Sequence, residues 1–245
     1  MTSAPVVCID GPSGAGKGTL AMRLAKHCQW HLLDSGALYR VVGKACLSAD
    51  VAWTDEEGAA AIARTLNAEF VVGDREVHVW LDGVDVTAEI RSELGSKGAS
   101  AVALLPGVRE ALLARQREWS RFPGLIADGR DMGTQVFPDA PLKIFLTASA
   151  EARAERRYSQ LLEKGESVSL PRLLDSIRDR DARDTSRSLS PLVAAGDAVT
   201  LDSTTLTAAQ VFSQVTDLMV SRGLLGRTSG DRPDTSDSAN RRQTR

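Results

Sequence analysis

The sequence predicts an α/β fold in which helices flank a central parallel sheet. Five short apolar runs are typical of buried strands, and they cover residues 5–10, 30–33, 125–128, 142–146 and 198–201. Helical patterns separate these runs, and strands that alternate with helices usually pair in parallel. A glycine-rich segment directly after the first run indicates the same class, because such a loop connects a buried strand to the start of a helix.

That first connection has the sequence GPSGAGKGT and is typical of a phosphate-binding loop. Glycines let successive backbone N–H groups turn toward phosphate oxygens, and the next helix adds its positive dipole end. Lys17, which we expect on an exposed loop, adds a mobile charge, and an ordinary Gly/Ser turn would not explain it. The loop predicts a nucleoside triphosphate site made of Gly11, Pro12, Ser13, Gly14, Ala15, Gly16, Lys17, Gly18 and Thr19.

The hydroxyl of this loop stands one residue away from its commonest position. Gly18 follows the lysine, where Ser or Thr usually binds magnesium, and the hydroxyl comes at Thr19. We therefore expect no direct protein ligand for Mg²⁺. Phosphates and water would hold the ion, with Thr19 and Asp128 nearby.

Composition and charge limit the classes of partner. A chain of 245 residues, 42% of them hydrophobic, can bury one sizeable core and carry a small inserted lobe. A net charge of -2 gives no support for a general nucleic-acid binder. No run of about 18 apolar residues indicates a membrane span, and the three cysteines have neither metal nor disulfide spacing. We expect a cytoplasmic monomer with no nucleic-acid or membrane partner.

Three further segments do not continue the strand and helix alternation of the sheet. Between about 70 and 90, the alternating run Val77–Leu81 and the turn pairs around it predict an antiparallel insert. Residues 149–163, followed by Lys164-Gly165 and Pro171, predict a charged helical hairpin that suits a mobile lid. From residue 226 onward no apolar period remains, as expected of a disordered tail.

Two clusters of arginine and acid follow predicted strands, where open parallel sheets bind ligands. The first is DSGALYR at 34–40, although a helix cap by Asp34 or Ser35 would explain part of it. The second is DGRDMG at 128–133, where we expect Gly129 to permit a sharp turn that brings Arg130 and Asp131 into a cleft. The alternative is a surface turn with a local ion pair.

A third cluster covers residues 178–187. In a helix, Arg180, Asp184 and Arg187 would share one face. A solvated charged helix is the simpler interpretation when this cluster is taken alone.

Taken together, these segments closely resemble the bacterial cytidylate kinases, which phosphorylate CMP and dCMP. The similarity runs from about residue 5 to 222, and six segments carry it in order: IDGPSGAGKGT at 9–19, LLDSGALYR at 32–40, PGVREALLARQR at 106–117, GLIADGRDMGT at 124–134, FPDAPLKIFL at 137–146 and LDSTTL at 201–206. The resemblance implies a P-loop kinase fold with a central parallel sheet flanked by helices. It implies a core at 1–49 and 91–225, a small antiparallel monophosphate-binding insert at 50–90 and a short helical lid at about 156–168. The disordered tail at 226–245 is predicted by composition and departs from the family pattern.

The resemblance also implies the site. Catalytic roles fall on Lys17, Arg130, Arg156 and Arg157, the last two in the lid. Substrate-binding roles fall on Ser35, Tyr39, Arg40, Ser100, Arg109, Arg130, Asp131, Arg180, Asp184 and Arg187. ATP with Mg²⁺ would be the phosphoryl donor, and CMP or dCMP the acceptor.

Asp131 is the candidate acceptor for the exocyclic amine of cytosine, with Arg109 and Arg187 beside the ring. The alternative is that Asp131 only orients Arg130. An adenylate or uridylate kinase is the rival activity, and a noncatalytic nucleotide-binding module is a second. A regulatory GTPase would share the phosphate loop, but the sequence has no Asn-Lys-x-Asp segment to read guanine.

Overall fold

The computed structural model describes residues 4–73, 76–163, 165–186 and 190–226. Two sequence-based expectations fall outside these ranges: Arg187, and the tail from residue 227 onward.

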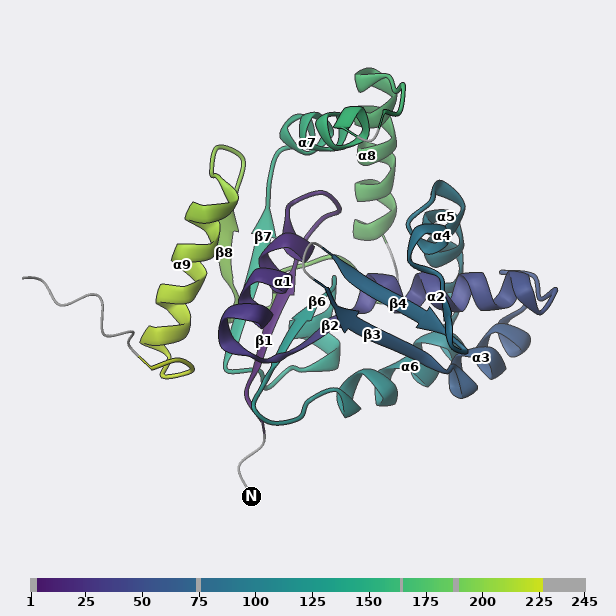
Figure 1. The fold of residues 1–245 in the computed structure, drawn as a ribbon, viewed down its shortest axis with the longest axis horizontal. Coiled ribbons are helices and arrows are strands. Elements are labelled where there is room, and N and C mark those ends of the chain that lie inside the picture. The colour runs from purple at the N-terminus through teal and green to yellow at the C-terminus, as the bar shows by residue number, and fades with distance from the viewer. Residues whose placement is uncertain (1–3, 74–75, 164, 187–189, 227–245) are drawn as a thin grey trace, which may run out of the picture.

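A five-stranded parallel sheet forms the centre of the molecule, in the order β2-β6-β1-β7-β8 (Figure 1). Each strand begins and ends within one residue of a run that the sequence predicted, and each pair of neighbours is parallel. The strands are β1 (Val6–Asp10), β2 (His31–Asp34), β6 (Leu125–Asp128), β7 (Leu142–Thr147) and β8 (Val199–Asp202). The predicted fold class is therefore confirmed.

Alternate residues of β1 enter two different apolar cores. Val7 and Ile9 belong to the larger core, together with buried residues of α1 (Lys17–Cys28) and α9 (Ala208–Ser221). Val6 and Cys8 enter the smaller core on the other face, which Met132 and Val136 help to fill. Because both faces are covered, the strand is apolar from Val6 to Ile9 rather than alternating, as the sequence pattern required.

A second, antiparallel sheet confirms the predicted insert. It consists of β3 (Ala68–Val72), β4 (Val77–Leu81) and β5 (Val84–Asp85). The helices around it are α2 (Ser35–Ser48), α3 (Glu56–Thr65), α4 (Thr87–Ile90), α5 (Glu93–Val102) and α6 (Pro106–Glu118). α2 and α5 pack closely, since a Cβ on Gly43 would lie 3.0 Å from the backbone of Gly98.

The predicted helical hairpin is also present. It is formed by α7 (Ala150–Glu163) and α8 (Leu170–Thr185), and Pro171 stands in the first turn of α8. Figure 1 shows both helices beyond the end of β7, on the same side of the molecule as the loop between β1 and α1. A π-helical turn, η1 (Met132–Val136), follows β6 and was not predicted.

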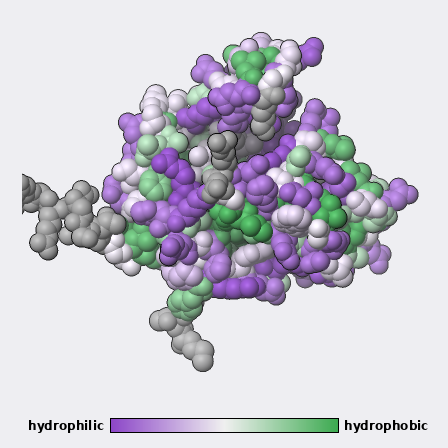
Figure 2. All heavy atoms as spheres, viewed as in Figure 1, coloured by the Kyte–Doolittle hydropathy of each residue, from purple (hydrophilic) through white to green (hydrophobic). Residues whose placement is uncertain are grey.

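The face shown in Figure 2 is covered mainly by polar side chains, with smaller apolar areas between them. Within the part of the chain that the structure describes, no helix combines the length and the apolar character needed to cross a bilayer.

We expect Gly11→Ala to lower the free energy of unfolding by more than about 1 kcal/mol. Gly11 has a φ of +146°, and a Cβ there would lie 1.9 Å from the carbonyl oxygen of Leu146 on β7. Gly196→Ala is the control, because nothing lies within 4 Å of its added Cβ. Urea unfolding of both variants measures the difference, and equal losses would contradict the explanation.

Candidate active site

The loop from Gly11 to Gly16 has the backbone that its sequence predicted. Gly11, Gly14 and Gly16 all have positive φ, at +146°, +82° and +98°. Only glycine adopts these conformations without strain. Gly16 is the N-cap of α1 and has no side chain to cap the helix, so the positive end of α1 faces the loop.

Lys17 is buried, which corrects the expectation of an exposed loop lysine. Its side chain is only 8% exposed, and its Nζ donates to the carbonyl of Pro12 at 3.0 Å. Asp128, at the end of β6, lies 4.0 Å from the same Nζ. Burial lowers the pKa of Lys17 and raises that of Asp128, because both groups lose hydration. The physical reason is that the loop wraps around its own lysine.

Asp10, which the sequence analysis did not select, holds the turn after β6. Its two carboxylate oxygens accept from the backbone N–H groups of Met132 and Gly133, each at 2.8 Å. Burial raises the pKa of Asp10 to about 6, and these two hydrogen bonds oppose the rise. The sequence feature that could have identified Asp10 is its place as an acidic residue at the end of an apolar strand.

Gly129 allows the turn for a different reason from the one we expected. Its φ lies outside the left-handed region, but a Cβ there would lie 2.7 Å from the side chain of Met132. Lack of space therefore requires glycine at this position. The interpretation of 128–133 as a surface turn is wrong, since Asp128 and Asp131 are both buried.

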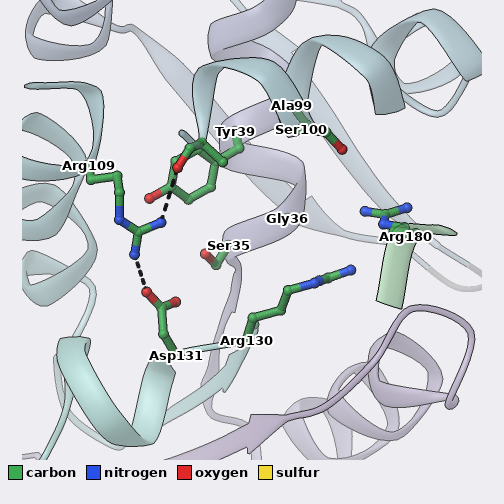
Figure 3. Close-up of a pocket in the computed structure, with 11 residues that line it drawn as sticks. Ser35, Gly36, Tyr39, Ala99, Ser100, Arg109, Arg130, Asp131 and Arg180 are labelled. Atoms are coloured by element: carbon green, nitrogen blue, oxygen red, sulfur yellow. Dashed lines mark hydrogen bonds and ion pairs between the residues drawn. The ribbon is translucent and has the colours of Figure 1, made fainter. Parts of the chain in front are cut away.

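A pocket opens beside this turn and gathers residues from five separate elements (Figure 3). α2 contributes Ser35 and Tyr39, α5 contributes Ser100, and α6 contributes Arg109. The remaining polar residues are Arg130 and Asp131 from the turn and Arg180 from α8. Seven of the ten expected substrate-binding residues thus line one cavity.

The base-binding and phosphate-binding candidates lie at different ends of this pocket. Arg109 pairs with Asp131 and lies over the ring of Tyr39, with its guanidinium carbon 6.0 Å from the ring centroid. Arg130 and Arg180 extend away from that pair toward the other side (Figure 3). One end of the pocket therefore holds an ion pair beside an aromatic ring, and the other end holds two arginines.

The alternative that Asp131 orients Arg130 is wrong for this structure. Asp131 pairs with Arg109, whereas Arg130 pairs with Asp184 of α8. Asp184 is 1% exposed and also lies 4.0 Å from Arg180. Asp184 therefore lies behind the pocket and holds Arg130 in place.

Arg40 does not line the pocket. Its Nη1 donates to the carbonyl of Ile90 at 2.9 Å and to the hydroxyl of Ser96 at 3.0 Å, which ties α2 to α4 and α5. The helix-cap interpretation is correct for Asp34, which accepts from the N–H of Ala37 at 2.8 Å. It is wrong for Ser35, which lines the pocket.

The two arginines expected in the lid lie outside this pocket as well. Arg156 donates to the hydroxyl and the carbonyl of Ser203, and that hydroxyl in turn donates to the carbonyl of Ala15 in the phosphate loop. Arg157 is exposed, and its charge contributes to lowering the pKa of Arg40, an effect that burial dominates. Ser203 was not selected from the sequence.

The residues around the phosphate loop fit a magnesium ion held through water and phosphate. Across the described residues, no group of three or more His, Cys, Asp or Glu side chains could hold a metal directly. Asp128 supplies carboxylate oxygens beside the loop, 4.0 Å from Nζ of Lys17, and such oxygens suit Mg²⁺. A Cβ on Gly18 would lie 3.5 Å from Asp128, so the glycine leaves this carboxylate uncovered by a side chain.

The model of the cytidylate kinase family matches residues 7–221. The chain belongs to this family. A cytidylate kinase from Erwinia tasmaniensis is 57% identical over 85% of this chain and 92% of its own. Cytidylate kinases from Pseudomonas putida and Escherichia coli are 54% and 56% identical, over 91% and 86% of this chain and 99% and 93% of their own.

Asp10→Asn should change how stability depends on pH. The folded state raises the pKa of Asp10 from 3.8 to about 6, so between these values it binds more protons than the unfolded state. The wild type should therefore lose stability relative to the variant as pH rises from 4 to 6, by about 2 kcal/mol. Urea unfolding of both proteins across this range measures the difference.

Asp197→Asn is the matched control and should respond with the opposite sign. Lys143 holds the pKa of Asp197 below its usual value, so the wild type should gain stability relative to this variant as pH rises. If the difference in free energy of unfolding between the wild type and Asp10→Asn does not change with pH, burial does not raise the pKa of Asp10.

Proposed function

We propose that the protein transfers the terminal phosphoryl group of ATP to CMP or dCMP, giving ADP and CDP or dCDP. One observation carries this proposal: a pocket with a carboxylate at one end and two arginines at the other opens at the turn after Asp128, which itself lies 4.0 Å from Lys17 of the glycine-rich loop. The relatives named cytidylate kinase support the same activity.

In the proposed reaction, a phosphate oxygen of CMP attacks the terminal phosphorus of ATP in line. A phosphate monoester has a second pKa of about 6, so the nucleophile is mostly a dianion at neutral pH and needs no general base. The residues must instead hold two anions together. We assign the acceptor phosphate to Arg130 and Arg180, and the transferring phosphate to Lys17 and the N–H groups of the loop.

For base recognition, the proposal uses the carboxylate of Asp131. The exocyclic amine of cytosine donates a hydrogen bond, whereas the corresponding oxygen of uracil only accepts one. Arg109 pairs with Asp131 and lies over Tyr39, so the carboxylate is held at the pocket wall. We infer that this arrangement favours CMP over UMP.

Magnesium bound with ATP would neutralise charge on its phosphates, with Thr19 and Asp128 in reach through water. We also propose that residues at about 156–168, which include the second half of α7, form a lid that closes over the phosphates and excludes water. Arg156 and Arg157 would act in the closed arrangement. The insert at 50–90 would complete the acceptor site, and the protein would act as a cytoplasmic monomer with no nucleic-acid or membrane partner.

Initial rates with ATP, Mg²⁺ and each of CMP, dCMP, UMP, AMP and GMP test the activity. We expect CMP and dCMP to give the highest kcat/KM. A preference for AMP or UMP would replace the proposal with the corresponding kinase, and no turnover with any acceptor would leave a nucleotide-binding module.

Asp131→Asn should lower kcat/KM for CMP by an amount equivalent to roughly 1 to 3 kcal/mol of transition-state stabilisation. It should also bring kcat/KM for CMP closer to that for UMP. The amide can turn its N–H₂ toward the base and offer a donor where cytosine also donates. The measurement is the ratio of kcat/KM for the two acceptors. An unchanged ratio would reject base reading by Asp131.

Asp184→Asn, behind the same pocket, is the matched control. Asp184 holds Arg130, which we assign to the phosphate that CMP and UMP share. This variant should therefore lower kcat/KM for CMP and for UMP by the same factor and leave the ratio of the two values unchanged.

A further inference from the structure

Arg153 is a buried arginine outside the pocket, and it joins the phosphate loop to both helices of the hairpin. It lies on α7 and is 4% exposed. Its Nη1 donates to the carbonyl of Ser13 at 3.0 Å and to Oδ1 of Asp181 on α8, also at 3.0 Å. Its Nη2 donates to the other oxygen of Asp181, and its Nε donates to the carbonyl of Ala148 at 3.0 Å. The guanidinium thus uses its fork to bridge three segments.

The stem of Arg153 also packs on the phosphate loop. A Cβ on Gly14 would lie 3.3 Å from the Cβ of Arg153, so the loop and α7 are in close contact at this glycine. The loop therefore contacts Arg153 at two neighbouring residues, Ser13 and Gly14. A shift of the loop would have to move the arginine or break its bond to Ser13.

The other end of the bridge leads to the acceptor pocket. Asp181 directly follows Arg180, which lines the pocket, and Asp184 one turn later holds Arg130. A helix is stiff over one turn, so the position of Asp181 determines where Arg180 and Asp184 lie. Arg153 and Asp181 thus connect the carbonyl of Ser13 to two arginines of the pocket.

We propose that the Arg153–Asp181 pair is a positioning element that couples the triphosphate loop to the acceptor pocket. The inference rests on the proposed function, in which these two sites hold ATP and CMP. When ATP fixes the loop, the pair places α8 so that Arg130 and Arg180 are ready for the acceptor phosphate. Such coupling is a free energy shared between two sites, and it acts in both directions.

The same two helices carry a second pair that does not touch the loop. Arg178 of α8 donates to Glu151 of α7 at 2.8 Å, and both side chains are more than half exposed. This pair bridges α7 and α8 as the buried pair does, but it lies in solvent. A variant of this exposed pair loses a contact between the two helices but no contact with the loop. It therefore tests whether the contact between the helices is enough by itself.

The experiment measures the dissociation constant of CMP calorimetrically, with and without a non-hydrolysable ATP analogue and Mg²⁺. In the wild type we expect the analogue to tighten CMP binding by roughly fivefold or more. In Asp181→Asn this factor should fall toward one. Because the factor compares each protein with and without the analogue, a change in CMP binding alone does not enter it. Glu151→Gln should keep the wild-type factor.

Arg153→Lys gives a second test if Asp181→Asn does not fold. It keeps the charge but cannot hold Ser13 and both oxygens of Asp181 at once, so it should also reduce the factor. A wild-type factor in a folded Asp181→Asn or Arg153→Lys would overturn the inference, as would an equal loss in Glu151→Gln or a factor of one in the wild type. Failure of the wild type to bind or phosphorylate CMP would instead reject the proposed function itself.

Discussion

Cationic side chains gathered at one edge of a sheet repel each other, and the structure places each of four of them against a carboxylate from a distant segment. Lys17 lies near Asp128, Arg109 pairs with Asp131, Arg130 with Asp184, and Arg153 with Asp181. Removing one member of a buried pair typically costs about 3 to 5 kcal/mol, because the other charge remains without compensation. These pairs therefore hold the site together before any ligand arrives.

The parallel sheet places the two loops that matter side by side. β1 leads into the phosphate loop, and β6, its neighbour, leads into the turn that carries Arg130 and Asp131. Asp10 links the end of β1 to that turn through two backbone N–H groups. The relative position of the two proposed nucleotide sites thus depends on one carboxylate and on strand pairing. α8 then adds Arg180 and Asp184 from the other side of the pocket.

The strands, the phosphate loop and the hairpin could be predicted from sequence because each depends on local patterns. Glycine spacing, apolar runs and a proline in the first turn are properties of neighbouring residues. The resemblance to cytidylate kinases then named residues such as Ser35, Ser100 and Arg109, which the structure brings into one pocket from α2, α5 and α6.

Errors arose where a side chain's role depends on a distant partner. Lys17 is buried because Pro12 and Asp128 surround it. The alternative in which Asp131 orients Arg130 fails for the same reason, since Asp131 pairs with Arg109 as the main interpretation allowed. Arg40 turns toward α4 and α5. Asp10 and Arg153 were missed because a single acid or arginine gives no sign of the buried contacts that it makes. No periodicity or spacing encodes such pairings.

The assignment of the base to Asp131 can be checked in a crystal structure of the protein with CMP bound. We expect the exocyclic amine of cytosine within about 2.7 to 3.2 Å of a carboxylate oxygen of Asp131, and the phosphate against Arg130 and Arg180. A base bound away from Asp131, or a phosphate bound beside Arg109 instead, would contradict it.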